Sequence, residues 1–131
     1  MLSNNGNKSL NSFIALNECT GLNLEGTEPV KQVFGYGGTL KSNKGDPEVL
    51  LIIKFMNNVN ISGIMIESSM DKSKLPTRME LFANNSSIDF SDIGSINPTE
   101  TLKVENGKIN TIKIAKFRNV SILTVNNFII F

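Results

Sequence analysis

A run of seven residues, Val49 to Phe55, constrains the fold more than any other feature of the chain. Every residue in it is apolar except Lys54. A run of strand length that does not alternate between apolar and polar residues is typical of a strand that is covered on both faces. We therefore expect a central strand here, with protein packed on each side of its sheet.

Shorter alternating segments follow, and residues that favour turns separate them. Asn57-Asn58 and Asn126-Asn127 predict turns, and Asn106-Gly107 predicts a tight hairpin. The alternation changes phase between Ile61 and Ile64, which predicts a β-bulge at Ser62-Gly63. Further strands are expected at 78–82, 101–104, 109–117, 120–125 and 128–131. Roughly seven short strands with little helix predict an all-β fold, a β-sandwich.

The N-terminal part of the chain differs from the rest. Residues 1–9 are polar, and we expect a flexible N-terminus there. Leu10, Phe13 and Ile14 follow at helical spacing and predict a short helix or helical turn that covers one end of the core. Residues 10–131 are of a length typical of a single domain.

One long loop interrupts the strands between Leu75 and Val104. The strand at Arg78–Phe82 ends at Asn84, and the next begins after Pro98. Within the loop, Ile88 and Phe90 are expected to anchor it on the core. A loop fixed in this way is a persistent surface feature, and such loops often carry function.

Composition excludes most enzyme chemistry. The chain has 131 residues, no histidine, one cysteine and a formal net charge of +1. Histidine-based acid–base catalysis, catalytic triads and most zinc sites are therefore excluded, and we expect no enzyme and no cofactor. A single Cys19 cannot form an internal disulfide, and we expect it to be buried or inert. With no apolar signal segment or membrane-spanning run, the expected location is the cytoplasm, the nucleus or both.

Two charged groups remain as candidate sites. Asp89 and Asp92 suggest a calcium or magnesium corner, but the ligand set is thin, and capping of a turn is the favoured interpretation. The second group is basic and surrounds one predicted hairpin; nucleic-acid binding would need interleaved aromatic residues, yet Trp is absent and Tyr occurs once. Protection of a sheet edge is favoured over a partner-facing patch. The basic residues are Lys103, Lys108, Lys113, Lys116 and Arg118.

Several segments, in their order and spacing, resemble one known family. They are Leu10–Ile14, Glu18-Cys19, Leu22-Asn23, Leu50–Phe55, Val59–Ile66, Leu75-Pro76-Thr77, Leu81-Phe82, Ile88-Asp89-Phe90, Pro98-Thr99, Lys116–Val120 and Leu123–Val125. This order is similar to that of the PITH domain, a proteasome-interacting module found at the C-terminus of thioredoxin-like proteins and alone in other members. The resemblance covers Leu10 to Phe131.

The resemblance implies a jelly-roll β-sandwich, like a galactose-binding domain, and a non-enzymatic role in docking onto the 26S proteasome at its 19S regulatory particle. Neither nucleic acid, a membrane nor a small-molecule substrate is expected as a partner. The contact residues we select, from loop position and charge, are Asp89, Phe90, Asp92, Lys116 and Arg118.

Three departures from the family affect this expectation. The chain has no thioredoxin domain and no Cys-x-x-Cys, so it resembles a minimal, stand-alone member. Arg118 stands where the family usually has Gln. A long family loop between the last two strands is reduced to Asn126-Asn127, and nothing follows Phe131.

Two other function classes stay open. A jelly roll that binds a small ligand or carbohydrate would use exposed aromatic platforms, and Tyr36 is the chain's only Tyr or Trp residue. A small redox or metal protein would have to depend on Cys19, which has no histidine to activate it.

Overall fold

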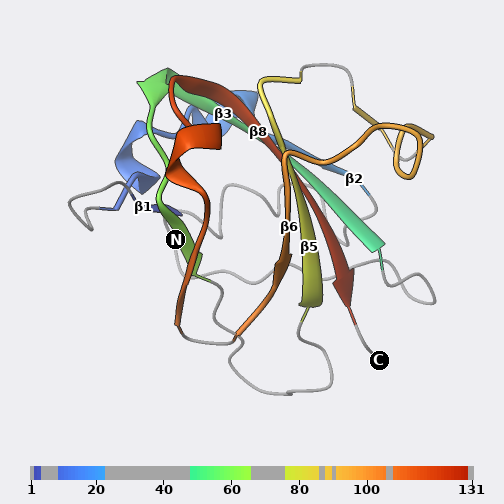
Figure 1. Ribbon diagram of the computed structural model, residues 1–131. Helices are drawn as coiled ribbons and strands as arrows, with labels where there is room; N and C mark the ends of the chain where they lie inside the picture. The colour runs from blue at the N-terminus through green and yellow to red at the C-terminus, as the bar shows by residue number, and fades with distance from the viewer. Residues whose placement is uncertain are drawn as a thin grey trace.

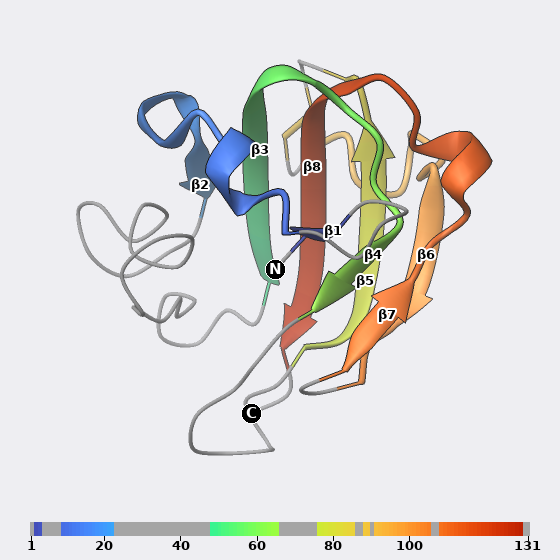
Figure 2. The same cartoon turned by 90° about the vertical axis from the view of Figure 1, so that its left-hand side faces the viewer.

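The computed structural model describes residues 2–3, 9–22, 48–65, 76–85, 88–89, 91–105 and 108–129. In these residues, two antiparallel sheets pack face to face (Figure 1). The larger sheet has the strand order β2-β3-β8-β5-β6, and the smaller has the order β1-β4-β7. Figure 2 shows the smaller sheet lying across one face of the larger. The predicted all-β sandwich is confirmed, and its jelly-roll connectivity stays a prediction.

The five-stranded sheet is built around two long neighbouring strands, one from the middle of the chain and one from its C-terminal part. Their pairing runs from Glu48↔Phe128 to Lys54↔Ile122, and it resumes at Val59↔Val120 after an irregularity. The strands of this sheet are β2 (Thr20–Leu22), β3 (Glu48–Val59), β5 (Pro76–Ala83), β6 (Glu100–Lys103) and β8 (Val120–Ile129).

The three-stranded sheet is made of very short strands, which are β1 (Leu2–Ser3), β4 (Gly63–Met65) and β7 (Ile109–Thr111). Three short 3-10 helices accompany the sheets in the described residues: η1 (Asn11–Phe13), η2 (Leu16–Glu18) and η4 (Ile114–Lys116). No helix in these same residues is long and apolar enough to cross a membrane.

Strand β3 is covered on both faces, as the apolar run predicts. Because successive side chains point to opposite faces of a sheet, Val49, Leu51 and Ile53 face the smaller sheet and join the main core. Leu50 points the other way and forms a second apolar cluster with Phe82 and Ile88. The loop at Ile88 therefore covers the part of the outer face that lies over Leu50 and Phe82.

The main core lies between the two sheets. Its largest fully buried side chain is Phe117, and Ile61 and Leu123 are also fully buried. The core is closed at one end by the N-terminal turns, where Leu10 and Ile14 are buried. The helical turn predicted there is confirmed as η1, and Ile14 also forms an antiparallel bridge with Phe55.

Two predicted turns are wrong. Asn57-Asn58 lies within β3 and Asn126-Asn127 within β8. At Asn126-Asn127, pairing with β3 and β5 outweighs the local preference of asparagine for turns, whereas Asn57-Asn58 lies in the irregular stretch of β3 between Lys54 and Val59. Because Asn126-Asn127 is paired strand, it is no shortened loop between two final strands, and the departure from the family inferred there is withdrawn.

The predicted bulge is also misplaced. Ile61 and Ile64 are both buried, but the chain passes from the larger sheet to the smaller between them. This passage reverses which alternate side chains face the core. The irregular pairing lies earlier, between Lys54 and Val59.

The expected strand over 109–117 is shorter than predicted. It ends at Thr111, and η4 follows, so Lys113, Lys116 and Phe117 do not share one strand. The hairpin residues Asn106-Gly107 lie outside the described residues. The strands on either side of them, β6 and β7, belong to different sheets and do not form a hairpin.

At the N-terminus, β1 falls within the segment 1–9 that was expected to be flexible. Its residues pair with β4 through Leu2↔Ile64 and Ser3↔Gly63. Flexibility of this segment stays a prediction.

Candidate protein-interaction surface

The loop that carries Asp89 and Asp92 is a compact turn held by its own side chains. The Asp89 amide donates to Asp92 Oδ2 at 2.9 Å, and the Ser91 amide donates to Asp89 Oδ1 at 2.9 Å. The Ser91 hydroxyl donates to the same Asp89 oxygen. Both carboxylates therefore cap backbone N–H groups of the turn, which is the turn-capping role that the sequence favoured over metal binding.

Further hydrogen bonds close this turn around Asp92. The Asp92 carbonyl accepts from the amides of Ser95 and Ile96 at 3.1 and 3.0 Å. Gly94 has φ +91°, a conformation that side chains with a Cβ rarely adopt. Within the described residues, no group of three or more His, Cys, Asp or Glu side chains could hold a metal ion.

Apolar residues on both sides of the turn fix it to the outer face of the larger sheet. Ile88 is 3% exposed and packs with Leu50 and Phe82, while Ile93 and Ile96 pack against the same cluster. The expected anchoring by Ile88 is confirmed, whereas Phe90 lies outside the described residues. Asp89 is therefore exposed on a fixed support.

Hydrogen bonding also sets the charge on this turn. Donation from the Ser91 hydroxyl and amide lowers the pKa of the Asp89 carboxyl below its ordinary value of 3.8. The turn therefore presents a negative charge at neutral pH.

Three of the five basic candidate residues lie on the segment 113–118, which contains η4, whereas Lys103 ends β6 and Lys108 precedes β7. Lys113, Lys116 and Arg118 are all exposed. Beside them, Phe117 is fully buried, and its carbonyl accepts from the Ile61 amide at 3.0 Å. The segment therefore holds three cations over a fixed backbone.

Contacts with the start of β6 hold the other side of this basic segment. The Lys113 amide donates to Glu100 Oε1 at 3.0 Å, and Lys116 Nζ lies 3.4 Å from the Thr99 carbonyl oxygen. Strand β6 is the edge strand of its sheet, so these contacts cover the N-terminal end of an edge strand. Arg118 differs, because its side chain forms no hydrogen bond or ion pair with any residue of the described part of the chain.

The two groups of candidate residues are not in contact. Figure 1 shows η4 on one side of β6 and the turn that contains Asp92 on the other. Lys116 connects them indirectly, because Thr99 immediately follows the loop. The structure thus separates an acidic turn, with Asp89 and Asp92, from a basic segment, with Lys116 and Arg118.

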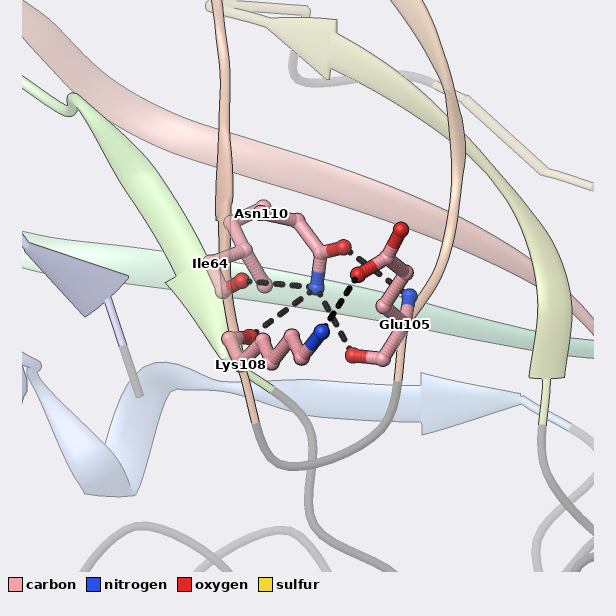
Figure 3. Close-up of polar contacts among 4 residues, drawn as sticks. All are labelled: Ile64, Glu105, Lys108 and Asn110. Carbon is pink, nitrogen blue, oxygen red and sulfur yellow. Dashed lines mark hydrogen bonds and ion pairs between the residues drawn. The ribbon is translucent and has the colours of Figure 1, made fainter.

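A polar cluster that sequence reasoning missed fixes the link between β6 and β7. Asn110 Nδ2 donates to the carbonyls of Ile64, Glu105 and Lys108, each at 3.2 Å, and Asn110 Oδ1 accepts from the Glu105 amide at 2.9 Å. Figure 3 shows the Asn110 amide at the centre of these groups, with Lys108 and Glu105 also forming an ion pair at 3.5 Å. The position of Asn110 three residues after the predicted Asn106-Gly107 turn was the only sequence signal for this cluster.

Three asparagines link the ends of β3, β5 and β8 through hydrogen bonds that the sequence did not predict. Asn84 and Asn119 have φ values of +58° and +54°, a conformation that asparagine tolerates better than most residues. Asn84 Oδ1 accepts from the Ser121 amide at 2.8 Å, and Asn84 Nδ2 donates to the Asn119 carbonyl at 3.2 Å. The Asn119 amide donates to Asn60 Oδ1 at 3.0 Å, so this network fixes the backbone that follows Arg118.

Cys19 sits in a half-buried pocket of backbone groups. Its Sγ lies 3.3 Å from the Ala15 carbonyl oxygen and accepts from the Lys54 amide at 3.4 Å. Burial raises the pKa of the thiol above its ordinary value of 9.0, which disfavours the reactive thiolate. The environment is that of a structural cysteine.

Comparison with known proteins agrees with the fold and its order of segments. No curated protein matches the chain. The family model of the PITH domain matches residues 2–127, nearly the whole of its 131 residues. The chain therefore belongs to the PITH domain family.

Proposed function

We propose that this protein is a non-enzymatic docking module that binds the 26S proteasome at its 19S regulatory particle. The observation that carries the proposal is the family match over residues 2–127, because the family is one of protein interaction and its name refers to the proteasome. A protein that binds proteasomes acts where they are, in the cytoplasm, the nucleus or both.

The basic segment is the part of the surface that we assign to the contact. Arg118 and Lys116 are exposed over a backbone held by Phe117 and Asn119, so the backbone itself loses little freedom when a partner binds their side chains. Arginine is also favoured at the centres of protein interfaces. The acidic turn, with Asp89 and Asp92, is a second contact on the other side of β6.

A pull-down tests the docking itself. The protein is tagged at its N-terminus and purified gently from its own cells, and the bound proteins are identified by mass spectrometry. Regulatory-particle subunits in stoichiometric amount are the expected result. An empty pull-down, with intact proteasomes shown in the same lysate, would overturn the proposal and favour the ligand-binding alternative.

Charge reversals then test which residues make the contact. Arg118→Glu and Lys116→Glu should each reduce proteasome recovery, and the two together should abolish it. Lys108→Glu is the control, because Lys108 is also exposed but lies at the other end of β7 from η4, and its surface ion pair with Glu105 contributes little to stability. Equal loss in the control variant would point to net charge rather than to a defined surface.

A separate variant tests the acidic turn. Asp92→Asn removes one charge while an amide oxygen still accepts from the Asp89 amide. If recovery falls with this variant and not with Arg118→Glu, the acidic turn is the contact and the basic segment is not.

A further inference from the structure

The outer face of the five-stranded sheet buries a pair of polar side chains that neither the family nor the docking proposal uses. Glu80 on β5 and Asn126 on β8 are directly opposite each other in the strand pairing. Glu80 is 9% exposed and Asn126 is fully buried, and Asn126 Nδ2 donates to Glu80 Oε1 at 3.2 Å.

This hydrogen bond fixes the orientation of the asparagine amide. Because the amide nitrogen is the donor in this hydrogen bond, the amide oxygen points away from Glu80. Asn126 Oδ1 is buried and has no hydrogen-bond partner among the described residues. An oxygen in this position carries the desolvation cost of burial without compensation.

A second buried oxygen without a described hydrogen-bond partner lies on the same face of β8. Thr124 is two residues before Asn126, so the two side chains project to the same side of the sheet. Thr124 is fully buried, and in the part of the chain that the structure describes its Oγ1 also has no hydrogen-bond partner. Two neighbouring unsatisfied oxygens call for a common explanation.

The surroundings in the described part of the chain are apolar. Leu50 pairs with Asn126 from β3, and Phe82 pairs with Thr124 from β5. Both belong to the cluster that Ile88 covers, below the loop of the acidic turn. Such neighbours supply no donor to either oxygen.

We propose that Thr124 and Asn126 form a buried hydration site that holds one internal water molecule beneath the loop. A water molecule lying between the two side chains would donate to Asn126 Oδ1 and Thr124 Oγ1, and buried waters typically make about three such bonds to groups left without partners. A divalent cation does not fit as well, because calcium takes roughly six to eight oxygen ligands and the carboxylate of Glu80 lies on the other side of the amide. This inference does not depend on the proposed function.

Substitution of Thr124 by valine tests the site, because the urea midpoint of unfolding should change in opposite directions with and without a bound water. If a water is bound, Thr124→Val removes one of its partners, and the urea midpoint of unfolding should fall. If the site is dry, the same change removes an unsatisfied hydroxyl, and the midpoint should rise. Thr101→Val is the matched control, because Thr101 lies on the same face of the sheet, opposite Glu80, but is exposed.

A high-resolution crystal structure of the unsubstituted protein gives a readout that does not depend on how the variant folds. We expect a density peak at hydrogen-bond distance, roughly 2.7–3.2 Å, from both Asn126 Oδ1 and Thr124 Oγ1. A site without density there would overturn the proposal, as would a midpoint for Thr124→Val above that of Thr101→Val.

Comparison of salts separates water from a bound ion. Urea midpoints measured in sodium, potassium and choline chloride at one ionic strength should agree if the guest is water. A midpoint that rises specifically with sodium or potassium would overturn the proposal in favour of a cation.

Discussion

Replacement of Phe117 by alanine should be among the most damaging single changes in this protein. The ring is fully buried in the main core, and the residue's amide and carbonyl both take part in backbone hydrogen bonds at 3.0 Å. Loss of a buried Phe side chain typically costs about 3–5 kcal/mol, from the lost transfer of the ring into the core and from the cavity it leaves. We expect a loss of about 4 kcal/mol in the free energy of unfolding.

This loss converts into a measurable change in melting temperature. At about 2.1 cal/mol/K per residue, the unfolding entropy of 131 residues is about 0.28 kcal/mol/K. A loss of about 4 kcal/mol therefore lowers the melting temperature by about 14 °C. Calorimetry measures the shift, and urea unfolding with an unchanged slope would show that the effect lies in stability itself.

The control uses another phenylalanine of the same chain. Phe13 is 43% exposed, so Phe13→Ala should cost about 1 kcal/mol. Equal losses for the two variants, or a loss below about 2 kcal/mol for Phe117→Ala, would refute the assignment of Phe117 to the core that supports the basic segment.

Three further predictions concern polar groups. Asn84→Ala should lose about 1–2 kcal/mol in urea unfolding, because alanine is strained at φ +58°, and Asn84→Asp should lose less, because Asp tolerates this backbone and keeps the oxygen that accepts from Ser121. Cys19 should react with iodoacetamide more slowly in the folded protein than in urea. Because burial raises the pKa of the thiol, the contribution of Cys19 to stability is present below pH 9.0 and is lost as pH rises through the folded pKa. Ser91→Ala should raise the pKa of Asp89 in an NMR titration. In the unsubstituted protein that pKa is lowered from 3.8, so the contribution of Asp89 to stability is present above pH 3.8 and is lost as pH falls through the folded pKa.

The strands that sequence analysis predicted best are those whose burial is set by local pattern. The run from Val49 to Phe55 identified β3 as a central strand, because a strand covered on both faces needs apolar residues at nearly every position. Ile88 was recognised as an anchor for a similar reason, since an isolated apolar residue in a polar loop usually has a place in a core.

The failures share one physical cause, which is that partners distant in sequence decide the local structure. Asn126 looks like a turn residue, yet Glu80 on the neighbouring strand binds its amide and keeps β8 continuous. The phase change between Ile61 and Ile64 was correctly noticed, but a bulge and a change of sheet produce the same pattern in a sequence. Pairing information, rather than propensity, would have been needed to tell them apart.

The candidate site could be predicted only as a set of separate residues. Charge and loop position selected Asp89, Asp92, Lys116 and Arg118, but nothing in their spacing shows that the acidic turn and the basic segment lie on different sides of β6 (Figure 1). The asparagines that fix the backbone around them, Asn84 and Asn110, were not recognised, because side-chain bonds to distant carbonyls and amides leave no periodic signal.

The position of β8 in the larger sheet has a consequence for how the chain folds as it is made. Strands β3 and β5 do not pair with each other, since each hydrogen-bonds to β8, whose first residue is Val120. Pairing between strands that lie far apart in the sequence is slow, and strands that are still unpaired are prone to aggregation. During synthesis, β3 and β5 therefore stay without their common neighbour until translation has passed Val120, and a chaperone that shields their apolar residues would act in that interval.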